Sequence, residues 1–341
     1  MSEPSMAPVE FVPSTAEDYE ELMSISEGIY NGIDYLPFRY HAWLKDPKRH
    51  MFLGKSEGRI VGFGSFLLVD EDETAVVEGL RVSPWLRGQG VAGMIQKFCI
   101  EKLRVDHPKV KRILLTHVNR PSPAMLKKYR LIHSKAVVTM ILPFDQIEGT
   151  IKLLESRLGN VGQSNNYTIL EPSEVLRLFE GTKTTEELLP GGLLVQHWLP
   201  LTAQRSNLEM LLKKGIVWMH QPENNADKEE TNSSHPLSLS SPTTSQRGFL
   251  SLGTPLFPIP YGEATYCLDI DMFGVDPACA KIHVVQQLKL SIQDLPVGSN
   301  IICLVYAEES LRTELNHLFE GQTPFILATD EVILEMDIRG A

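Results

Sequence analysis

Residues 80–93 combine a cation with several very small side chains and read LRVSPWLRGQGVAG. Gly90 and Ala92 leave the backbone open to a close ligand, and Arg87 offers five N–H donors suited to phosphate oxygens. In a turn that opens a helix, successive backbone N–H groups converge at the positive end of the helix dipole. This combination predicts a site for a phosphorylated ligand.

The same stretch lacks the features of two common nucleotide loops. It has no Lys-Ser or Lys-Thr pair, which argues against magnesium and nucleoside-triphosphate chemistry. It also has no three-glycine dinucleotide pattern followed by a ribose-binding acid on a second strand. We therefore expect a pyrophosphate ligand held without a metal ion.

The elements around the stretch place it between a strand and a helix. Residues 74–82 predict a strand, and residues 91–106 predict an amphipathic helix that ends at His107-Pro108. Residues 112–118 predict the next strand. A strand–helix–strand connection of this length implies a right-handed crossover and parallel neighbouring strands.

The rest of the first half predicts a compact set of further elements. Strands are expected at residues 9–12, 51–54, 59–66 and 134–142, and helices at 14–29, 41–45 and after Pro121 and Pro123. Residues 30–40 are rich in aromatic side chains and predict a loop.

The second half repeats this order more weakly. Strand, helix, strand, helix and strand are expected at 265–270, 276–289, 301–306, 309–319 and 332–338. Earlier pieces predict strands at 167–170, 192–198 and 216–219 and helices at 173–180 and 203–214. The place of the phosphate loop is taken by Asp276-Pro277, which would repel phosphate and remove a donor. Residues 1–7 and the polar stretch 222–247 predict disorder.

Composition narrows the class of protein. The 341 residues are 43% hydrophobic and 22% charged, which is typical of a globular protein with room for two domains. The net charge of −11 argues against nucleic acid or an anionic membrane as the main partner. The four cysteines are widely spaced and form no zinc pattern, and neither a secretory signal nor a membrane span is evident. We expect a cytoplasmic protein without a metal.

The stretch 82–92 resembles the acetyl-CoA loop of the GNAT superfamily of N-acetyltransferases, whose Arg/Gln, Gly and Gly/Ala places are Arg87, Gly90 and Ala92. The resemblance implies an α/β fold with a mixed sheet, a catalytic GNAT domain over residues 8–145, and a divergent GNAT-like domain over 150–341 without the phosphate loop. The residues expected to bind the cofactor, acetyl-CoA, are Leu80, Arg81, Val82, Arg87, Gly88, Gln89, Gly90, Val91, Ala92, Gly93 and Ser122.

Three residues are candidates for proton transfer. The resemblance implies that Tyr129 protonates the departing thiolate, although the Gly-Phe that usually follows this tyrosine is Leu131-Ile132-His133 here. Glu78 is the first candidate base, because strand alternation would place it on the face of Leu80 and opposite Arg81. His117, at the end of the neighbouring strand, is the second candidate, and a water chain is a third. A carboxylate at position 78 paired with a lysine or arginine is the structural alternative.

The acceptor is expected against the aromatic segment 30–44, where Tyr35, Phe38, Tyr40 and His41 suit an imidazole or a peptide side chain and could equally fill the core. The stretches YNGIDYLPFRYHAWL and VEGLRVSPWLRGQGVAG resemble the vertebrate histidine N-acetyltransferase group. That resemblance implies acetyl transfer to the α-amine of L-histidine, a small-molecule partner. The residues alone indicate CoA-dependent acyl transfer, and leave open a lysine or N-terminal protein acetyltransferase and a non-catalytic CoA-binding scaffold.

Overall fold

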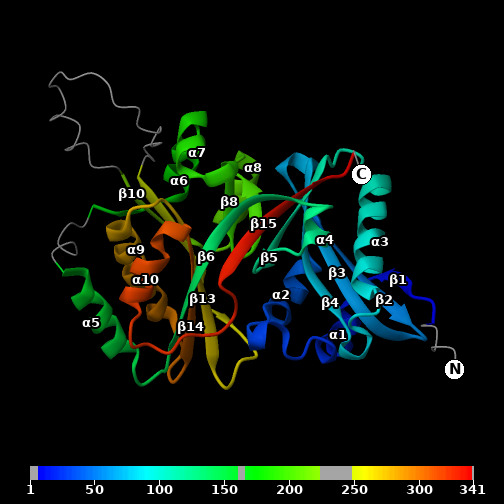
Figure 1. The fold of residues 1–341 in the computed structure, drawn as a ribbon, viewed down its shortest axis with the longest axis horizontal. Coiled ribbons are helices and arrows are strands. Elements are labelled where there is room, and N and C mark those ends of the chain that lie inside the picture. The colour runs from blue at the N-terminus through cyan, green and yellow to red at the C-terminus, as the bar shows by residue number, and fades with distance from the viewer. Residues whose placement is uncertain (1–6, 160–165, 223–247, 340–341) are drawn as a thin grey trace.

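The computed structural model describes residues 7–159, 166–222 and 248–339 (Figure 1). A mixed sheet of 13 strands runs through both halves of the chain, with helices on its two faces. The predicted α/β class with a mixed sheet is confirmed. The predicted disorder at residues 1–7 and 222–247 concerns segments that lie, except for Ala7 and Pro222, outside the described residues.

The strands follow one another along the sheet in the order β1-β2-β3-β4-β5-β15-β6-β14-β13-β11-β10-β7, with β12 paired to β13 and β8 paired to β9 in a separate hairpin. In chain order the strands are β1 (Glu10–Pro13), β2 (Arg49–Ser56), β3 (Arg59–Val69), β4 (Thr74–Val82), β5 (Arg112–Val118), β6 (Arg130–Leu142), β7 (Thr168–Ile169), β8 (Leu193–Gln196), β9 (Leu199–Thr202), β10 (Val217–Gln221), β11 (Phe249–Gly253), β12 (Phe257–Pro258), β13 (Thr265–Phe273), β14 (Asn300–Ala307) and β15 (Asp330–Asp337).

The helices cover the faces of this sheet. They are α1 (Tyr19–Ser24), α2 (Leu36–Trp43), α3 (Val91–Asp106), α4 (Pro123–Leu126), α5 (Ile147–Leu158), α6 (Pro172–Leu178), α7 (Thr182–Leu188), α8 (Arg205–Leu212), α9 (Pro277–Ser291) and α10 (Arg312–Leu318). None of the described helices is long and apolar enough to cross a membrane.

The helix in the aromatic segment begins earlier than the sequence predicts. Residues 30–40 were expected as a loop and the helix at 41–45, whereas α2 starts at Leu36. Leu36, Tyr40 and Trp43 are all buried, and their spacing puts them on one side of a helix. Burial of that side stabilises a helix in this segment, although its many aromatic residues led us to predict a loop.

The predicted parallel pair is confirmed, and it is short. β4 and β5 pair in parallel through Thr74–Arg112, Ala75–Ile113 and Val76–Leu114. Beyond these residues no pairing joins the two strands in the described part of the chain, so the last six residues of β4 separate from β5. The sheet therefore splays open directly before the loop that follows β4.

Each half of the chain gives its last strand to the other half. β15, at the end of the chain, lies between β5 and β6 and pairs with both in antiparallel fashion. β6, from the first half, pairs along Ala136–Leu142 with β14 of the second half. Because β13 and β14 repeat the parallel pair of β4 and β5, the two halves are related units that share exchanged strands at their junction (Figure 1).

Candidate active site

The loop between β4 and α3 has the conformation that an anion site needs. Gly88 and Gly90 adopt positive φ values of 80° and 87°, which favour glycine. A side chain built on either glycine would meet nothing within 4 Å, so the loop is open to a ligand. Arg87 is exposed, and its Nε donates to the carbonyl of Val82 at 3.3 Å, which holds the side chain across the loop.

The amides at the start of α3 are available as donors. Gly90 caps α3 without a side-chain hydrogen bond, and the first amide of the helix with a backbone acceptor is that of Met94, bonded to the Gly90 carbonyl at 3.1 Å. The amides of Val91, Ala92 and Gly93 therefore point out of the helix without a partner in it. Together with the helix dipole they fit the pyrophosphate of a coenzyme.

The second half fills the equivalent place with its own side chains. Asp276 caps α9, and its carboxylate accepts from the amide of Cys279 at 2.8 Å. At Gly274 a side chain would come within 2.4 Å of the ring of Phe249. A carboxylate and an aromatic ring thus occupy the corner where the first half leaves room for phosphate.

A bulge in β4 changes the predicted facing of Glu78. Ser65 of β3 lies opposite Glu78 and Phe63 lies opposite Arg81, so Gly79 and Leu80 together face one residue of β3. Gly79 has a φ of 75°, as expected at such a bulge. The predicted alternation was therefore wrong: Glu78 shares the face of Arg81, and Leu80 lies on the other. The isolated glycine within a strand pattern was the signal for this bulge.

Glu78 lies in a buried ion pair on the face covered by α2, which is the pairing that the structural alternative to a base predicts. Its Oε2 accepts from Arg49 of β2 at 2.5 Å, and both side chains are only 4% exposed. The Arg49 guanidinium also stacks on Trp43, 3.8 Å from the ring centroid. A Cβ built on Gly79 would lie 3.2 Å from the Trp43 ring, so the indole packs directly on the bulge.

Arg81 points away from the phosphate loop. Its guanidinium is fully buried and pairs with Asp34 at 2.6 Å, below the rings of Tyr30 and Tyr35. The side chain therefore holds the aromatic segment on the sheet, and only the backbone of Arg81 faces the splayed edge of β4.

The two candidate bases lie on opposite faces of the sheet. His117 pairs with Val332 of β15 and shares the face of Ile113 and Leu115, which pack with α3. Burial lowers the pKa of His117, so the ring stays neutral at physiological pH. Glu78 lies on the α2 face, so one acceptor amine cannot use both groups.

Tyr129 and Ser122 flank α4 on the α3 face. Tyr129 is 7% exposed within the apolar cluster that contains Val91 and Ile95, and burial raises the pKa of its phenol. It therefore keeps its proton at neutral pH, as an acid must. Ser122 caps α4 by accepting from the amide of Met125 at 3.3 Å.

Of the four predicted acceptor residues, Phe38 lines a cavity and the others lie elsewhere. Tyr35 and Tyr40 belong to the buried cluster beneath α2, and the Tyr40 hydroxyl donates to the Thr15 carbonyl at 2.6 Å. His41 is exposed and lies beside Tyr19, with ring centroids 4.8 Å apart. A direct role of these three in acceptor binding stays a prediction.

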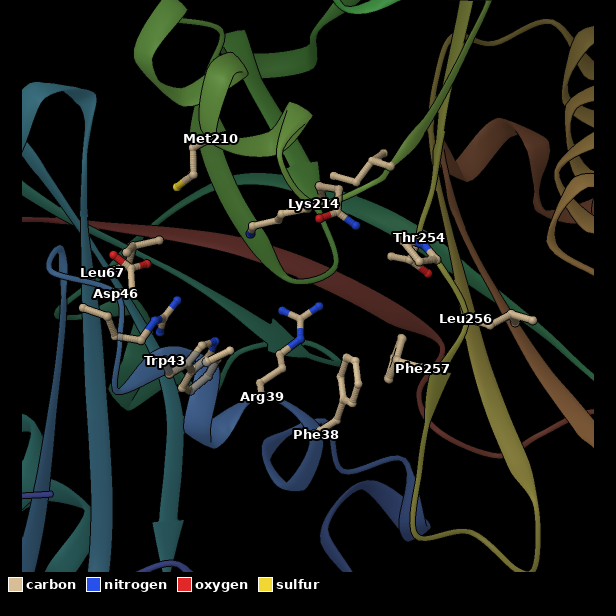
Figure 2. Close-up of a pocket in the computed structure, with 15 residues that line it drawn as sticks. Phe38, Arg39, Trp43, Asp46, Leu67, Met210, Lys214, Thr254, Leu256 and Phe257 are labelled. Atoms are coloured by element: carbon tan, nitrogen blue, oxygen red, sulfur yellow. The ribbon is translucent and has the colours of Figure 1, made fainter. Parts of the chain in front are cut away.

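The cavity at Phe38 has a volume of about 400 Å³ and lies between the two halves (Figure 2). α2 supplies its aromatic floor with Phe38 and Trp43, and the segment 254–257 supplies the adjoining wall, with Phe257 beside Phe38. Two of its polar residues could not be found from the first half alone, because Lys214 follows α8 and Thr254 follows β11. The lining residues that sequence analysis did not single out are Arg39, Ala42, Trp43, Asp46, Arg49, Leu67, Gln196, Met210, Lys214, Ile216, Thr254, Pro255, Leu256 and Phe257.

Positive charge dominates this cavity. Of the residues that the structure describes, Arg39, Arg49 and Lys214 line it together with one carboxylate, that of Asp46, while Arg49 is paired with Glu78. Burial lowers the pKa of Arg39, and burial together with the charge of Arg39 lowers the pKa of Lys214 to about 7. The cavity thus has a cationic side and an aromatic side, next to the ion pair on β4.

Comparison with known proteins agrees with this arrangement. The Acetyltransferase (GNAT) family matches residues 15–131, and the family described as Histidine N-acetyltransferase, C-terminal, matches residues 163–247 and 235–308. A tandem GNAT protein from the clavulanic acid biosynthesis pathway superposes with a TM-score of 0.55 at 15% identity, covering 97% of this chain and 99% of that one. The fold and loop therefore define a tandem GNAT acetyltransferase.

Relatives of nearly full length narrow this class. The chain is 31% identical over 340 residues to histidine N-acetyltransferase of Xenopus tropicalis, covering 96% of this chain and 95% of the relative. It is 35% identical over 344 residues to probable N-acetyltransferase 16 of Homo sapiens, covering 97% and 86%. The chain belongs to the histidine N-acetyltransferase family of the GNAT superfamily, and it is an acetyltransferase.

Proposed function

We propose that this protein moves the acetyl group of acetyl-CoA to the α-amine of L-histidine and releases N-acetylhistidine and CoA. The observation that carries the proposal is the open loop 87–93, with free amides at the start of α3, beside a sheet that splays at β4. Acetyl-CoA would supply an activated thioester there. The relatives named histidine N-acetyltransferase support histidine as the acceptor.

The chain's own groups divide the work between the two faces of the sheet. On the α3 face, the amides of residues 91–93 and the Arg87 guanidinium bind the pyrophosphate. On the α2 face, the Glu78 carboxylate, paired with Arg49, holds the acceptor ammonium and accepts its proton. Tyr129 holds a proton for the leaving sulfur. The backbone of β4 at the bulge offers the N–H donors for the developing oxyanion.

The size of the cavity, and its walls from both halves, favour a small acceptor. Residues of both halves surround it, and a volume of about 400 Å³ suits a single amino acid. A protein acetyltransferase needs a groove for an extended chain, whereas residues of the second half form one wall of this cavity. Phe38 and Phe257, with ring centroids 6.0 Å apart, offer an aromatic wall for an imidazole.

A panel of amines with acetyl-CoA, followed by release of free thiol, tests the proposal. We expect L-histidine to react with the highest kcat/KM, and mass spectrometry to find one acetyl group on its α-nitrogen. Equal rates across unrelated amines would remove histidine from the proposal. Tight CoA binding without turnover of any amine or lysine peptide would favour a scaffold instead.

A further inference from the structure

Two cations in the cavity between the halves have no carboxylate partner among the described residues. Among the described residues, no carboxylate oxygen lies within 4 Å of the guanidinium of Arg39 or the amino group of Lys214, whereas Arg49 beside them is paired with Glu78. Arg39 comes from α2 and Lys214 from the turn after α8, and Figure 2 shows both reaching into the same space. A partly buried cation without a counter-ion is costly, so two facing one cavity indicate a site for an anion.

The remaining surroundings limit what that anion can be. The guanidinium of Arg39 lies against the rings of Tyr35 and Phe257, 5.7 and 5.9 Å from their centroids. These contacts hold the planar group in place. The Arg39 guanidinium and the nearby amino group of Lys214 suit the two oxygens of a carboxylate. The cavity also borders Trp43, which packs on the β4 bulge, and Arg49, which is paired with Glu78, so a ligand held by its carboxylate at Arg39 lies on the same face of the sheet as Glu78.

We propose that Arg39 and Lys214 together bind the α-carboxylate of the amino-acid acceptor and select amino acids over simple amines. This inference rests on the proposed function. The first half contributes Arg39 and the second half contributes Lys214, so the proposed acceptor site is complete only when both halves are present.

Histamine tests the proposal, because it has the imidazole and primary amine of histidine without the carboxylate. We expect the wild-type protein to use histidine with a kcat/KM on the order of 10- to 100-fold above that for histamine. Arg39→Gln and Lys214→Met should each raise the KM for histidine by on the order of 10-fold and leave the KM for histamine and acetyl-CoA unchanged. Lys213→Met, at the neighbouring exposed lysine, is the matched control and should change neither.

Melting temperature separates binding from folding. Lys214→Met removes an unpaired cation, so it should keep or raise the Tm while weakening histidine binding. A wild type that uses histamine as well as histidine, or variants with an unchanged KM for histidine, would overturn the carboxylate site and leave acetyl transfer intact. If no small amine reacts, histidine binding measured by thermal shift decides: loss of binding in both variants would support the site, and equal or absent binding would overturn it.

Discussion

At the scale of single residues, the proposed proton transfer rests on Glu78. Its ion pair with Arg49 is buried and lies beside Trp43, so the carboxylate is held in one position. The neutral histidine on the other face of the sheet, His117, cannot replace it for an amine held in the cavity between the halves.

Glu78→Gln should lower kcat/KM for histidine on the order of 100-fold at neutral pH, because the acceptor loses both its charge partner and its base. The measurement is a steady-state rate with acetyl-CoA in excess. Glu73→Gln breaks an exposed pair with Lys111 just before β4 and serves as the control. A kcat/KM within twofold of wild type for Glu78→Gln would assign the proton to another group or to water.

Lys214 makes a pH-dependent prediction, since its pKa is lowered to about 7 by burial, Arg39 and Arg49, with Glu78 and Asp46 opposing them. Below that pKa the lysine is charged and holds the carboxylate, and above it the charge is lost. The ratio of kcat/KM for wild type to that for Lys214→Met should therefore fall from about pH 6 to about pH 9. Taking the ratio removes the titration of the acceptor amine, which both proteins share. A ratio that rises with pH would contradict the assignment.

At the scale of elements, the bulge of β4 connects the loop to the cavity. Gly79 has a positive φ, and its missing side chain leaves room for the rings of Phe63 and Trp43 at 3.0 and 3.2 Å from the Cβ position. The bulge thus sets the position of Trp43, and with it the floor of the cavity between the halves.

Gly79→Ala should destabilise the protein by about 2–3 kcal/mol, combining the strain of a left-handed alanine with displacement of the two rings. Gly298→Ala has a φ of 78° and nothing within 4 Å, so it should cost only the strain, about 1 kcal/mol. Urea denaturation measures both variants. Equal losses of unfolding free energy in the two variants would show that the close contacts at Gly79 do not matter. A kcat of Gly79→Ala equal to that of wild type would show that the bulge has no role in catalysis.

At the scale of the whole molecule, the exchanged strands bury a charged cluster where the halves meet. Lys135 of β6 lies 3.9 Å from Asp271 of β13 and opposite Glu331 of β15, and all three side chains are at most 1% exposed. Burial raises the pKa of Asp271 to about 7, raises the pKa of Glu331 and lowers the pKa of Lys135. The lysine is the cation between two acids of different strands.

Lys135→Met should destabilise the protein by about 3–5 kcal/mol at pH 8, because two buried acids lose their cation. The raised pKa values mean that the folded state holds these protons more tightly than the unfolded chain, so stability falls as pH rises through the window from about 4 to 7. The destabilisation caused by Lys135→Met should therefore be smaller at about pH 5, where the two acids are protonated. Lys111→Met, at an exposed pair, is the control for urea unfolding at both pH values. A loss independent of pH would contradict the charge account.

The sequence could predict what depends on neighbours in the chain. The loop 87–93, α3, the parallel pair and the repeat in the second half all follow from local pattern, and each is found. The exchange of β6 and β15, the pairing of Glu78 with Arg49 and the approach of Lys214 to Arg39 depend on contacts between segments far apart in the chain. Strand alternation failed at Gly79 because one extra residue reverses the facing of every residue on one side of it.

The most direct test of the account is the affinity for CoA measured by isothermal titration calorimetry on wild type and Gly90→Glu. The substitution places a carboxylate where the amides of α3 would meet the pyrophosphate, so affinity should fall on the order of 100-fold or more. Gly298→Glu shares the backbone conformation and the open surroundings, and should bind CoA as wild type does. Unchanged affinity in Gly90→Glu, with its Tm equal to that of Gly298→Glu, would show that the coenzyme binds elsewhere and would contradict the account.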